Sequence, residues 1–540
     1  MIRQWRTAWL PVIWFGFLLL HAADAFAVDG PELTRIFPAG GQRGTVVEVT
    51  GSGKFPTWPL SLWCDCDALT WTCLEASGKF SVSISNDAPL GVHWLRLHDA
   101  NGATSIKPFV VGAIAEASET EPNDRLVEGP LLEDLPVLVN GTLEKSGDVD
   151  SVRVKLKAGE TLVASVDAAR FLGSPVDACL QLVDAKGFVI DQNLDFHDLD
   201  PQLVYTAIAD GEFAIRVFGF PSAPNGTIGF AGEAGFLYRL TLTTGPWLES
   251  CEPLAVSSLQ PTKLTLLGFN INSAPAIDIA AQPVVTDKEQ EAFYLPDDLA
   301  RGLVSLPVKP YEVLVFDRSL GEKPQPMTLP ACMTGCVREP KEQHAFQLEA
   351  MKDSAWRFSI DSRKLGSHLD AELRLVATDG KVLAAINDAG NAADPVLDWI
   401  CPVDGSYRIF VRDLYDAGSE QHFYRLTMEP QVPEATLTLV DDLIVGKVGQ
   451  EVEVLVNIQR TFGYKEEIIV RCEPVPDGVT CEPVVSLGDG ESAKQVKLKI
   501  VASKPIQSPL RIQSPLNPQA IRSSKSVPGQ ANIWLSMVQP

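Results

Sequence analysis

The sequence predicts an all-β protein made of tandem β-sandwich domains, immunoglobulin-like and jelly-roll-like in character, behind an N-terminal signal peptide. Apolar and polar residues alternate in stretches such as "TVVEVTG", "DSVRVKLKAGETLVASVD" and "EVEVLVNIQ". Turn sequences such as "DAKG", "ADGE" and "TDGK" separate these stretches. After the first 27 residues, no stretch of about ten residues or more has convincing helical periodicity. A chain of 540 residues is also too long for one core, so we expect several domains.

The first 27 residues are expected to direct export and to be removed. A basic start, "MIRQWR", precedes the apolar run "TAWLPVIWFGFLLL" and a small-residue end in which Ala25-Phe26-Ala27 matches A-x-A. We predict cleavage after Ala27. No other stretch approaches the roughly 20 apolar residues that a spanning helix needs. The mature chain is therefore predicted to lack a transmembrane segment and to reside in the periplasm, on the cell surface or in the medium.

The composition and net charge of the chain indicate a folded protein and exclude one class of binding partner. The content of 45% hydrophobic and 21% charged residues is typical of a folded protein. The formal net charge of -24 predicts a surface that repels phosphate backbones, so we expect no nucleic-acid partner.

One long segment occurs twice in the chain. "CLQLVDAKGFVI" at 179–190 aligns with "ELRLVATDGKVL" at 372–383, an offset of 193 residues. "DP" at 200–201 and "ADGEFAIRVF" from 209 recur 194 residues later, and "FLYRLTL" from 236 recurs 186 residues later as "HFYRLTM". A repeat that contains several strands predicts two copies of one domain.

The repeat and its flanking segments divide the mature chain into five predicted β domains. A sandwich-like segment precedes the first copy, and a weaker counterpart precedes the second. A fifth unit with alternating strands and a Pro/Ser-rich end follows them. We refer to these units as domains 1 to 5, with predicted boundaries 28–113, 114–245, 246–338, 339–430 and 431–540.

Domain 2 resembles the bacterial pre-peptidase C-terminal (PPC) domain, a β-sandwich accessory module of exported proteins. The resemblance rests on "ETEPND", "SGDVDSVRVKLKAGETL", "DGEFAIRV" and "YRLTL". Domain 4 keeps only the later strands of this pattern and is a degenerate copy. The opening "P..G..G..V.V.G" and the stretch "APLGVHWLRL" of domain 1 resemble immunoglobulin-like IPT/TIG modules, and domain 3 is a divergent second example. Domain 5 is similar to immunoglobulin domains in a general way. These resemblances imply modules that are not themselves catalytic.

The stretch "SETEPNDRLVEGP", residues 118–130, opens domain 2 with clustered acidic groups. Pro122 disfavours helix before it, so the stretch is predicted to be extended. Alternate residues of an extended chain project to one side, which groups Glu119, Glu121 and Asn123. Farther along, "SGDVDSV" places Asp148 and Asp150 two residues apart. Calcium takes about six to eight oxygen ligands from carboxylates, amides and carbonyls.

The resemblance to PPC domains, some of which bind calcium at these motifs, implies a calcium site. Its residues here would be Glu119, Glu121, Asn123, Asp124, Asp148 and Asp150. A solvated acidic linker whose polar groups cap turns is the alternative, and both interpretations remain open. Domain 4 carries "CVREPKEQHAFQLEA" in place of these motifs, so we expect it not to bind calcium.

Ten cysteines in an exported chain predict some disulfides. The best local pair is Cys472 and Cys481 in "RCEPVPDGVTCEP". A turn at Pro476-Asp477-Gly478 would bring two strands together with these cysteines opposed, so we predict a disulfide between them.

Motifs of common hydrolases and nucleotide-binding enzymes are absent, including H-E-x-x-H, G-x-S-x-G, the P-loop and G-x-G-x-x-G. The sequence therefore predicts a non-enzymatic, modular binding or structural protein of the bacterial envelope or extracellular space. Its partner would be an unidentified protein or polysaccharide. The alternative is an accessory subunit or remnant of an exported peptidase or hydrolase system, because PPC-like modules usually accompany peptidase domains.

Overall fold

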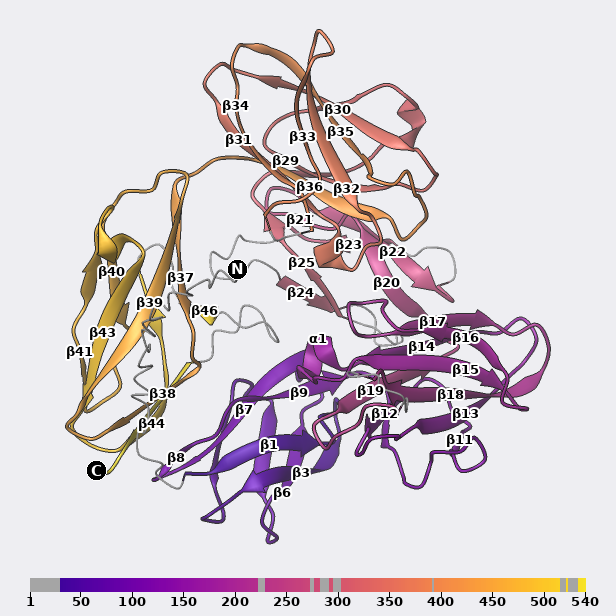
Figure 1. The fold of residues 1–540 in the computed structure, drawn as a ribbon, viewed down its shortest axis with the longest axis vertical. Helices are drawn as coiled ribbons and strands as arrows, with labels where there is room; N and C mark the ends of the chain where they lie inside the picture. The colour runs from indigo at the N-terminus through magenta and orange to yellow at the C-terminus, as the bar shows by residue number, and fades with distance from the viewer. Residues whose placement is uncertain are drawn as a thin grey trace, which may run out of the picture.

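The computed structural model describes residues 30–221, 229–271, 276–281, 291–294, 303–390, 393–514, 521–522 and 533–540. The predicted signal peptide lies outside these ranges. The described chain is nearly all β-strand, as the alternating pattern predicted (Figure 1). Its one α-helix is α1, Ala169–Leu172. Among the described residues, no helix is long and apolar enough to cross a membrane.

Domain 1 is a sandwich of two sheets, with strand orders β1-β3-β6-β5 and β2-β9-β7-β4 and with β8 paired to β7. Its core contains Leu33, Phe80, Leu95, Leu97 and Phe109. The strands are β1 Glu32–Phe37, β2 Gly40–Gln42, β3 Val46–Lys54, β4 Ser61–Cys64, β5 Leu69–Cys73, β6 Lys79–Ile84, β7 Gly91–Asp99, β8 Gly102–Ala103 and β9 Lys107–Gly112.

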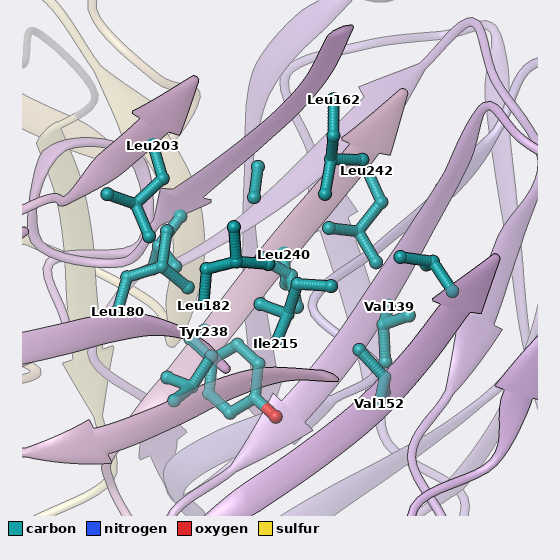
Figure 2. Packing of buried hydrophobic residues seen from close by; sticks show 14 of the residues in the cluster. Val139, Val152, Leu162, Leu180, Leu182, Leu203, Ile215, Tyr238, Leu240 and Leu242 are labelled. Carbon is teal, nitrogen blue, oxygen red and sulfur yellow. The ribbon is translucent and has the colours of Figure 1, made fainter. Parts of the chain in front are cut away.

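Domain 2 packs two five-stranded sheets face to face, in the orders β10-β12-β19-β14-β17 and β11-β13-β18-β15-β16. Leu180, Leu182 and Ile215 from one sheet meet Leu240 and Leu242 from the other in a buried core (Figure 2). The strands are β10 Glu116–Ser118, β11 Leu131–Leu132, β12 Val137–Thr142, β13 Asp150–Leu156, β14 Thr161–Asp167, β15 Ala178–Asp184, β16 Val189–Asn193, β17 Gln202–Thr206, β18 Gly211–Gly219 and β19 Leu237–Thr243.

Domain 3 is described in part, by three small sheets ordered β20-β22-β23, β21-β26 and β24-β25. Leu248, Val256, Leu264 and Leu266 belong to its core. The strands are β20 Trp247–Glu252, β21 Val256–Ser257, β22 Thr262–Phe269, β23 Ala276–Ile279, β24 Glu291–Tyr294, β25 Leu303–Leu306 and β26 Val308–Lys309.

Domain 4 repeats the strand order of domain 2, with sheets β27-β29-β36-β31-β34 and β28-β30-β35-β32-β33. Its sheets include three strands that precede residue 339, so the unit reaches back to Glu312. The repeat in the sequence is strong only in the later strands, which is why the earlier ones were assigned to domain 3. The elements are β27 Glu312–Val315, η1 Arg318–Leu320, β28 Gln325–Met327, β29 Ala331–Cys336, β30 Gln343–Ala350, β31 Ala355–Asp361, η2 Arg363–Leu365, β32 Ala371–Ala377, β33 Val382–Ile386, β34 Val396–Ile400, β35 Gly405–Asp413 and β36 Phe423–Pro430.

Domain 5 has sheets ordered β41-β43-β39-β37-β46, β38-β47-β44 and β42-β40-β45. Val456, Val470, Leu498 and Leu535 lie in its core. The elements are β37 Glu434–Leu439, β38 Leu443–Lys447, β39 Glu451–Thr461, β40 Ile468–Cys472, β41 Val479–Cys481, β42 Val484–Ser486, η3 Glu491–Ala493, β43 Gln495–Ala502, β44 Ile506–Leu510, β45 Ile512–Gln513, β46 Ile521–Arg522 and β47 Ile533–Val538.

Arginine side chains occupy several joints between consecutive domains. Arg35 of domain 1 donates a hydrogen bond to the Ala234 carbonyl of domain 2, at 2.7 Å. Arg425 of domain 4, which is 4% exposed, donates to the Leu254 carbonyl of domain 3 at 2.8 Å. The guanidinium of Arg357 in domain 4 lies 4.2 Å from the ring centroid of Phe462 in domain 5. The planar, multidentate guanidinium suits such partly dehydrated contacts.

Domains 2 and 3 meet through a shorter polar side chain. The Asn270 amide of domain 3 donates to the Thr161 carbonyl of domain 2, at 2.9 Å. Each pair of consecutive domains is thus linked by at least one specific contact.

Candidate metal centre

The predicted acidic residues gather at one end of domain 2, where the chain passes from β10 to the start of β13. The Glu119 amide donates to the Asn140 carbonyl and so extends the β10–β12 pairing by one residue. At the far end of the segment, the Val149 amide donates to Asp124 Oδ1 at 3.3 Å. Both ends of the segment are therefore tied to the sandwich.

Three carboxylates converge at this end of the sandwich. One oxygen each of Glu119, Glu121 and Asp150 lies within 4.8 Å of the other two. No other set of three or more histidine, cysteine or acidic ligand atoms converges in this way within the described ranges.

Two further side chains of the predicted set are buried beside this trio. Asn123 and Asp148 are each 1% exposed, and Asp150 is 3% exposed. The backbone amide of Asn123 donates to Glu121 Oε2 at 3.1 Å, which places its side chain toward Glu119. Asp124 is exposed and caps the start of β13 through the Val149 amide. The structure therefore places five of the predicted residues in the cluster and Asp124 at its edge.

Several oxygens of the cluster are buried without a hydrogen-bond donor among the described residues. These are Asn123 Oδ1, Asp148 Oδ1 and both carboxylate oxygens of Asp150. The nearest cation to Asp148 Oδ1 is the Lys145 ammonium, at 3.9 Å, which is beyond hydrogen-bond range. Buried polar atoms are almost always paired, so four such oxygens in one place call for either a shared proton or a cation.

Burial makes the ionised state of these groups unfavourable. Burial, followed by the charge of Glu119, raises the pKa of Asp150 to about 10. Burial also raises the pKa of Glu119, Glu121 and Asp148 above their ordinary values. Without a cation, Glu119 and Asp150 can avoid repulsion only by sharing a proton. A divalent cation would remove the need for that proton.

The donor set fits calcium. Every side chain in the cluster offers oxygen, from carboxylates and one amide, and none offers sulfur or imidazole nitrogen. Calcium prefers about six to eight oxygens in a flexible arrangement, whereas zinc favours nitrogen and sulfur. Glu119, Glu121, Asn123, Asp148 and Asp150 would hold the ion, and its charge would balance the carboxylates.

Tyr238 on β19 is a residue of this site that the sequence reasoning missed. Its hydroxyl donates to Glu119 Oε2 at 3.1 Å, while the Thr142 amide donates to Glu119 Oε1. The ring lies across Gly141, where a Cβ atom would collide with the ring carbon Cζ. The matching tyrosine in the repeated "YRLT" motif was the signal that could have identified it.

Domain 4 builds a different centre at the equivalent place. The Phe316 amide donates to the Thr334 carbonyl, as Glu119 donates to Asn140, so Phe316 replaces Glu119. His344 pairs with Val411 on β35 as Asp150 pairs with Val217 on β18, so His344 replaces Asp150. The sequence comparison had located the altered segment at 336–350. The counterpart of Glu119 lies earlier because β27 provides the strand that pairs with β29.

In domain 4, the residues that replace the acidic cluster make their contacts with one another and with neighbouring side chains, without an ion. The rings of Phe316 and His344 stack with centroids 3.7 Å apart. His344 Nδ1 bonds to the Tyr424 hydroxyl at 2.7 Å, and its Nε2 bonds to Glu342 Oε1 at 3.0 Å. Burial lowers the pKa of His344 to about 4, so the imidazole is neutral near pH 7. Tyr424 corresponds to Tyr238, which is the one side chain that the two centres share.

The predicted cysteine pair lies in domain 5. Cys472 ends β40 and Cys481 ends β41, and their sulfurs are 2.8 Å apart. The two strands lie in different sheets and are not paired with each other, and the turn between them through Gly478, which has a φ of +84°, brings the sulfurs together. The disulfide itself stays a prediction.

No protein family model matches the chain, and no curated protein is similar to it in sequence. Among solved structures, it is similar to the pre-peptidase C-terminal domain of a collagenase from Bacillus anthracis, with 13% identity, 20% of this chain and 96% of that chain covered, and a TM-score of 0.17. This is the family whose motifs domain 2 resembles.

Two larger proteins show equally weak likeness. The M60 catalytic domain with two CBM51 domains from Clostridium perfringens ZmpB is 10% identical, with 76% of this chain and 56% of that chain covered and a TM-score of 0.14. A Bacteroides ovatus protein of a mixed-linkage glucan utilization locus, SGBP-B, is 8% identical, with 74% and 77% covered and a TM-score of 0.15. At such TM-scores these likenesses carry no argument about what this chain binds or does.

Proposed function

We propose that this chain is a non-enzymatic, exported, modular binding or structural protein whose domain 2 holds a structural calcium ion. The observation that carries the calcium site is the group of buried, unpaired oxygens of Asn123, Asp148 and Asp150 beside Glu119 and Glu121. The replacement of Glu119 and Asp150 by Phe316 and His344 in domain 4 supports it, because that copy needs no ion to pair its buried groups.

The absence of a recognisable catalytic arrangement among the described residues supports a non-enzymatic role. The nearest approach to a triad is Ser419 Oγ, which lies 2.8 Å from His422 Nδ1. No described carboxylate forms a hydrogen bond to the other ring nitrogen of His422, and the nearby Asp413 instead accepts backbone amides, among them those of Tyr415 and Ala417. A serine nucleophile needs a base that a third group orients, and that group is missing here.

Calcium titration of the mature chain, residues 28–540, tests the site. We expect one binding event by calorimetry. We also expect the unfolding temperature of domain 2 to rise by on the order of 5–10 °C at a hundredfold excess over Kd. Asp150→Asn should abolish the calcium response. The same variant should raise the unfolding temperature of the calcium-free protein near pH 7, because the amide stays neutral beside Glu119 without the proton that Asp150 must hold in the folded state.

Asp191→Asn is the matched control, since Asp191 is an exposed carboxylate on β16 of the same domain. It should leave both the calcium response and the calcium-free stability unchanged. Equal calcium responses in wild type and Asp150→Asn would exclude the site. So would a calcium-free Asp150→Asn protein less stable than wild type.

A role as an accessory subunit or remnant of an exported peptidase or hydrolase system is the second candidate, favoured only by the resemblance of domain 2 to PPC domains. Capture of envelope proteins and polysaccharides on the calcium-loaded chain separates the two roles. A peptidase among the retained proteins would favour the accessory role. Substrate turnover by the purified chain that a single substitution removes would contradict both.

A further inference from the structure

One face of domain 1 is buried although it points away from that domain's core. On β7, Leu95 and Leu97 point into the core, and Arg96 between them points to the opposite side. That side of a sandwich sheet normally faces water, yet Arg96 is 0% exposed. An arginine is almost never fully buried unless its charge is paired, so another part of the molecule must cover it.

Domain 5 provides the cover. Arg96 Nη2 donates to Asp442 Oδ2 at 2.6 Å, across 346 residues of sequence, while its Nη1 bonds to the Thr104 carbonyl of domain 1. The guanidinium carbon lies 5.8 Å from the ring centroid of Trp534. In Figure 1, β7 and β8 of domain 1 lie beside β38 and β44 of domain 5.

Aromatic rings extend the contact on both sides of the ion pair. Trp63 on β4 and His98 on β7 have ring centroids 5.7 Å and 5.1 Å from that of Trp534. Trp63 is paired with Arg96 in the β4–β7 ladder, so these side chains share one face of the sheet. We call the surface formed by Trp63, Arg96 and His98 against Asp442 and Trp534 the 1–5 interface.

The burial pattern of β47 shows the same interface from the side of domain 5. Ile533, Leu535 and Met537 point into the domain 5 core. The alternate residues Trp534 and Val538 point the other way, yet each is only 2% exposed. A strand with both faces buried needs a second layer, and β8 of domain 1 lies against β47.

We propose that the 1–5 interface closes the five-domain chain on itself and that the Arg96–Asp442 ion pair keeps it closed. Domains 2 and 4 also touch, through the rings of Phe196 and His368, but the 1–5 interface joins the first and last domains, which no linker connects directly. Its persistence therefore depends on the contact itself, aided by the high effective concentration that the intervening domains impose. The buried ion pair makes the closure sensitive to a single residue, because the loss of one charge removes the oppositely charged partner of the other across the interface.

Small-angle X-ray scattering of the full mature chain tests this closure, with Asp442→Lys as the variant. The introduced ammonium would place a second cation against Arg96 and should detach domain 5 from domain 1. We expect the maximum dimension to rise by about 30 Å, roughly the diameter of one domain of 100 residues. Circular dichroism checks that the strands persist. If Asp442→Lys loses them, Asp442→Asn, which removes the charge and keeps the size, replaces it.

Asp441→Lys is the matched control, because Asp441 is the exposed neighbour and the substitution changes the net charge equally. This variant should scatter as the wild type does. A wild-type chain that is already extended would overturn the proposal, as would identical scattering of the Asp441 and Asp442 variants. Calcium is held constant throughout, so a failure here leaves the calcium site of domain 2 untouched.

Discussion

Asp150 bears the largest electrostatic cost in the acidic cluster of domain 2. Its carboxyl is buried beside Glu119, and these two causes raise its pKa to about 10. Since the unfolded pKa is near 3.8, the calcium-free folded state holds a proton that the unfolded state releases between about pH 4 and pH 10. In that window the stability of calcium-free domain 2 should fall as the pH rises.

Calcium binding should therefore displace a proton. At pH 8 we expect about one proton to be released per ion bound, because the ion takes over the role of the proton that Glu119 and Asp150 share. Calorimetry in two buffers with different ionisation enthalpies measures this release directly. The Asp191→Asn control should release the same number, and binding without proton release would show that Asp150 is ionised before the ion arrives.

His344 of domain 4 should make stability depend on pH with the opposite sign. Its pKa is lowered from 6.5 to about 4, so the unfolded state takes up a proton that the folded state refuses. The stabilisation by the neutral imidazole is complete above about pH 6.5 and is lost as the pH falls toward 4. The loss should approach about 3 kcal/mol, an upper bound from the pKa difference.

Chemical denaturation at pH 4.5 and pH 7.5 measures this effect, with His344→Phe as the comparison because the ring is retained and cannot titrate. The difference in the free energy of unfolding between the two pH values should shrink in the variant. An unchanged difference would assign the acid sensitivity of domain 4 to other groups.

At the scale of elements, the repeated "DP" motif allowed the domain repeat to be predicted but not the structural role of its aspartate. Its recurrence at 200–201 and 394–395 revealed the repeat, but its purpose became visible only in the fold. Asp200 accepts the backbone amides of Ala168, Ala169 and Arg170 at the start of α1. Asp394 accepts the amides of Ser362, Arg363 and Lys364 at the start of η2. These backbone amides lie about 30 residues before the aspartate that caps them. A cap between such distant residues has no local sequence pattern from which it could be predicted.

The two aspartates should therefore have matched effects. Asp200→Ala should destabilise domain 2, and Asp394→Ala should destabilise domain 4, each by about 2–3 kcal/mol, because several buried backbone donors lose their acceptor. Denaturant unfolding of the full chain measures both losses. The exposed Asp191→Ala should cost under about 0.5 kcal/mol. If Asp200→Ala also cost under about 0.5 kcal/mol, water would be replacing the carboxylate as the acceptor of the backbone amides.

The strands could be predicted from the alternation of apolar and polar residues, because every second residue of a strand faces the core of a sandwich. The start of domain 4 could not, since the early strands share only a short L-P-x-x-x-x-G pattern with domain 2, "LPVLVNG" at 135–141 and "LPACMTG" at 329–335, which is too sparse to reveal β27 and β28. The acidic cluster could be predicted from alternation too, because Glu119, Glu121, Asp148 and Asp150 stand at alternate positions near strand ends. Tyr238 comes from β19, about 90 residues farther along, and reaches the site only through sheet pairing.

For the whole molecule, the sequence indicated five domains but gave no signal that the first and last would touch. "VHWLRLHD" reads as an ordinary strand with one buried face. Arg96 and His98 on its other face resemble solvent-exposed residues, and their partners Asp442 and Trp534 lie more than 300 residues away. Such contacts depend on the accumulated geometry of four domain joints, which composition and periodicity do not encode.

The 1–5 interface also sets an order of events during biogenesis. β7 leaves the ribosome long before β47, so the Trp63–Arg96–His98 face of domain 1 has no covering partner in its own chain until the other four domains have been synthesised. A newly folded domain 1 would therefore expose an aromatic, cationic surface. Domain 5 of a neighbouring copy could bind this surface before domain 5 of the same chain has folded. A high local concentration of new chains would favour exchange of domain 5 between copies, whereas a low concentration would favour chains closed on themselves.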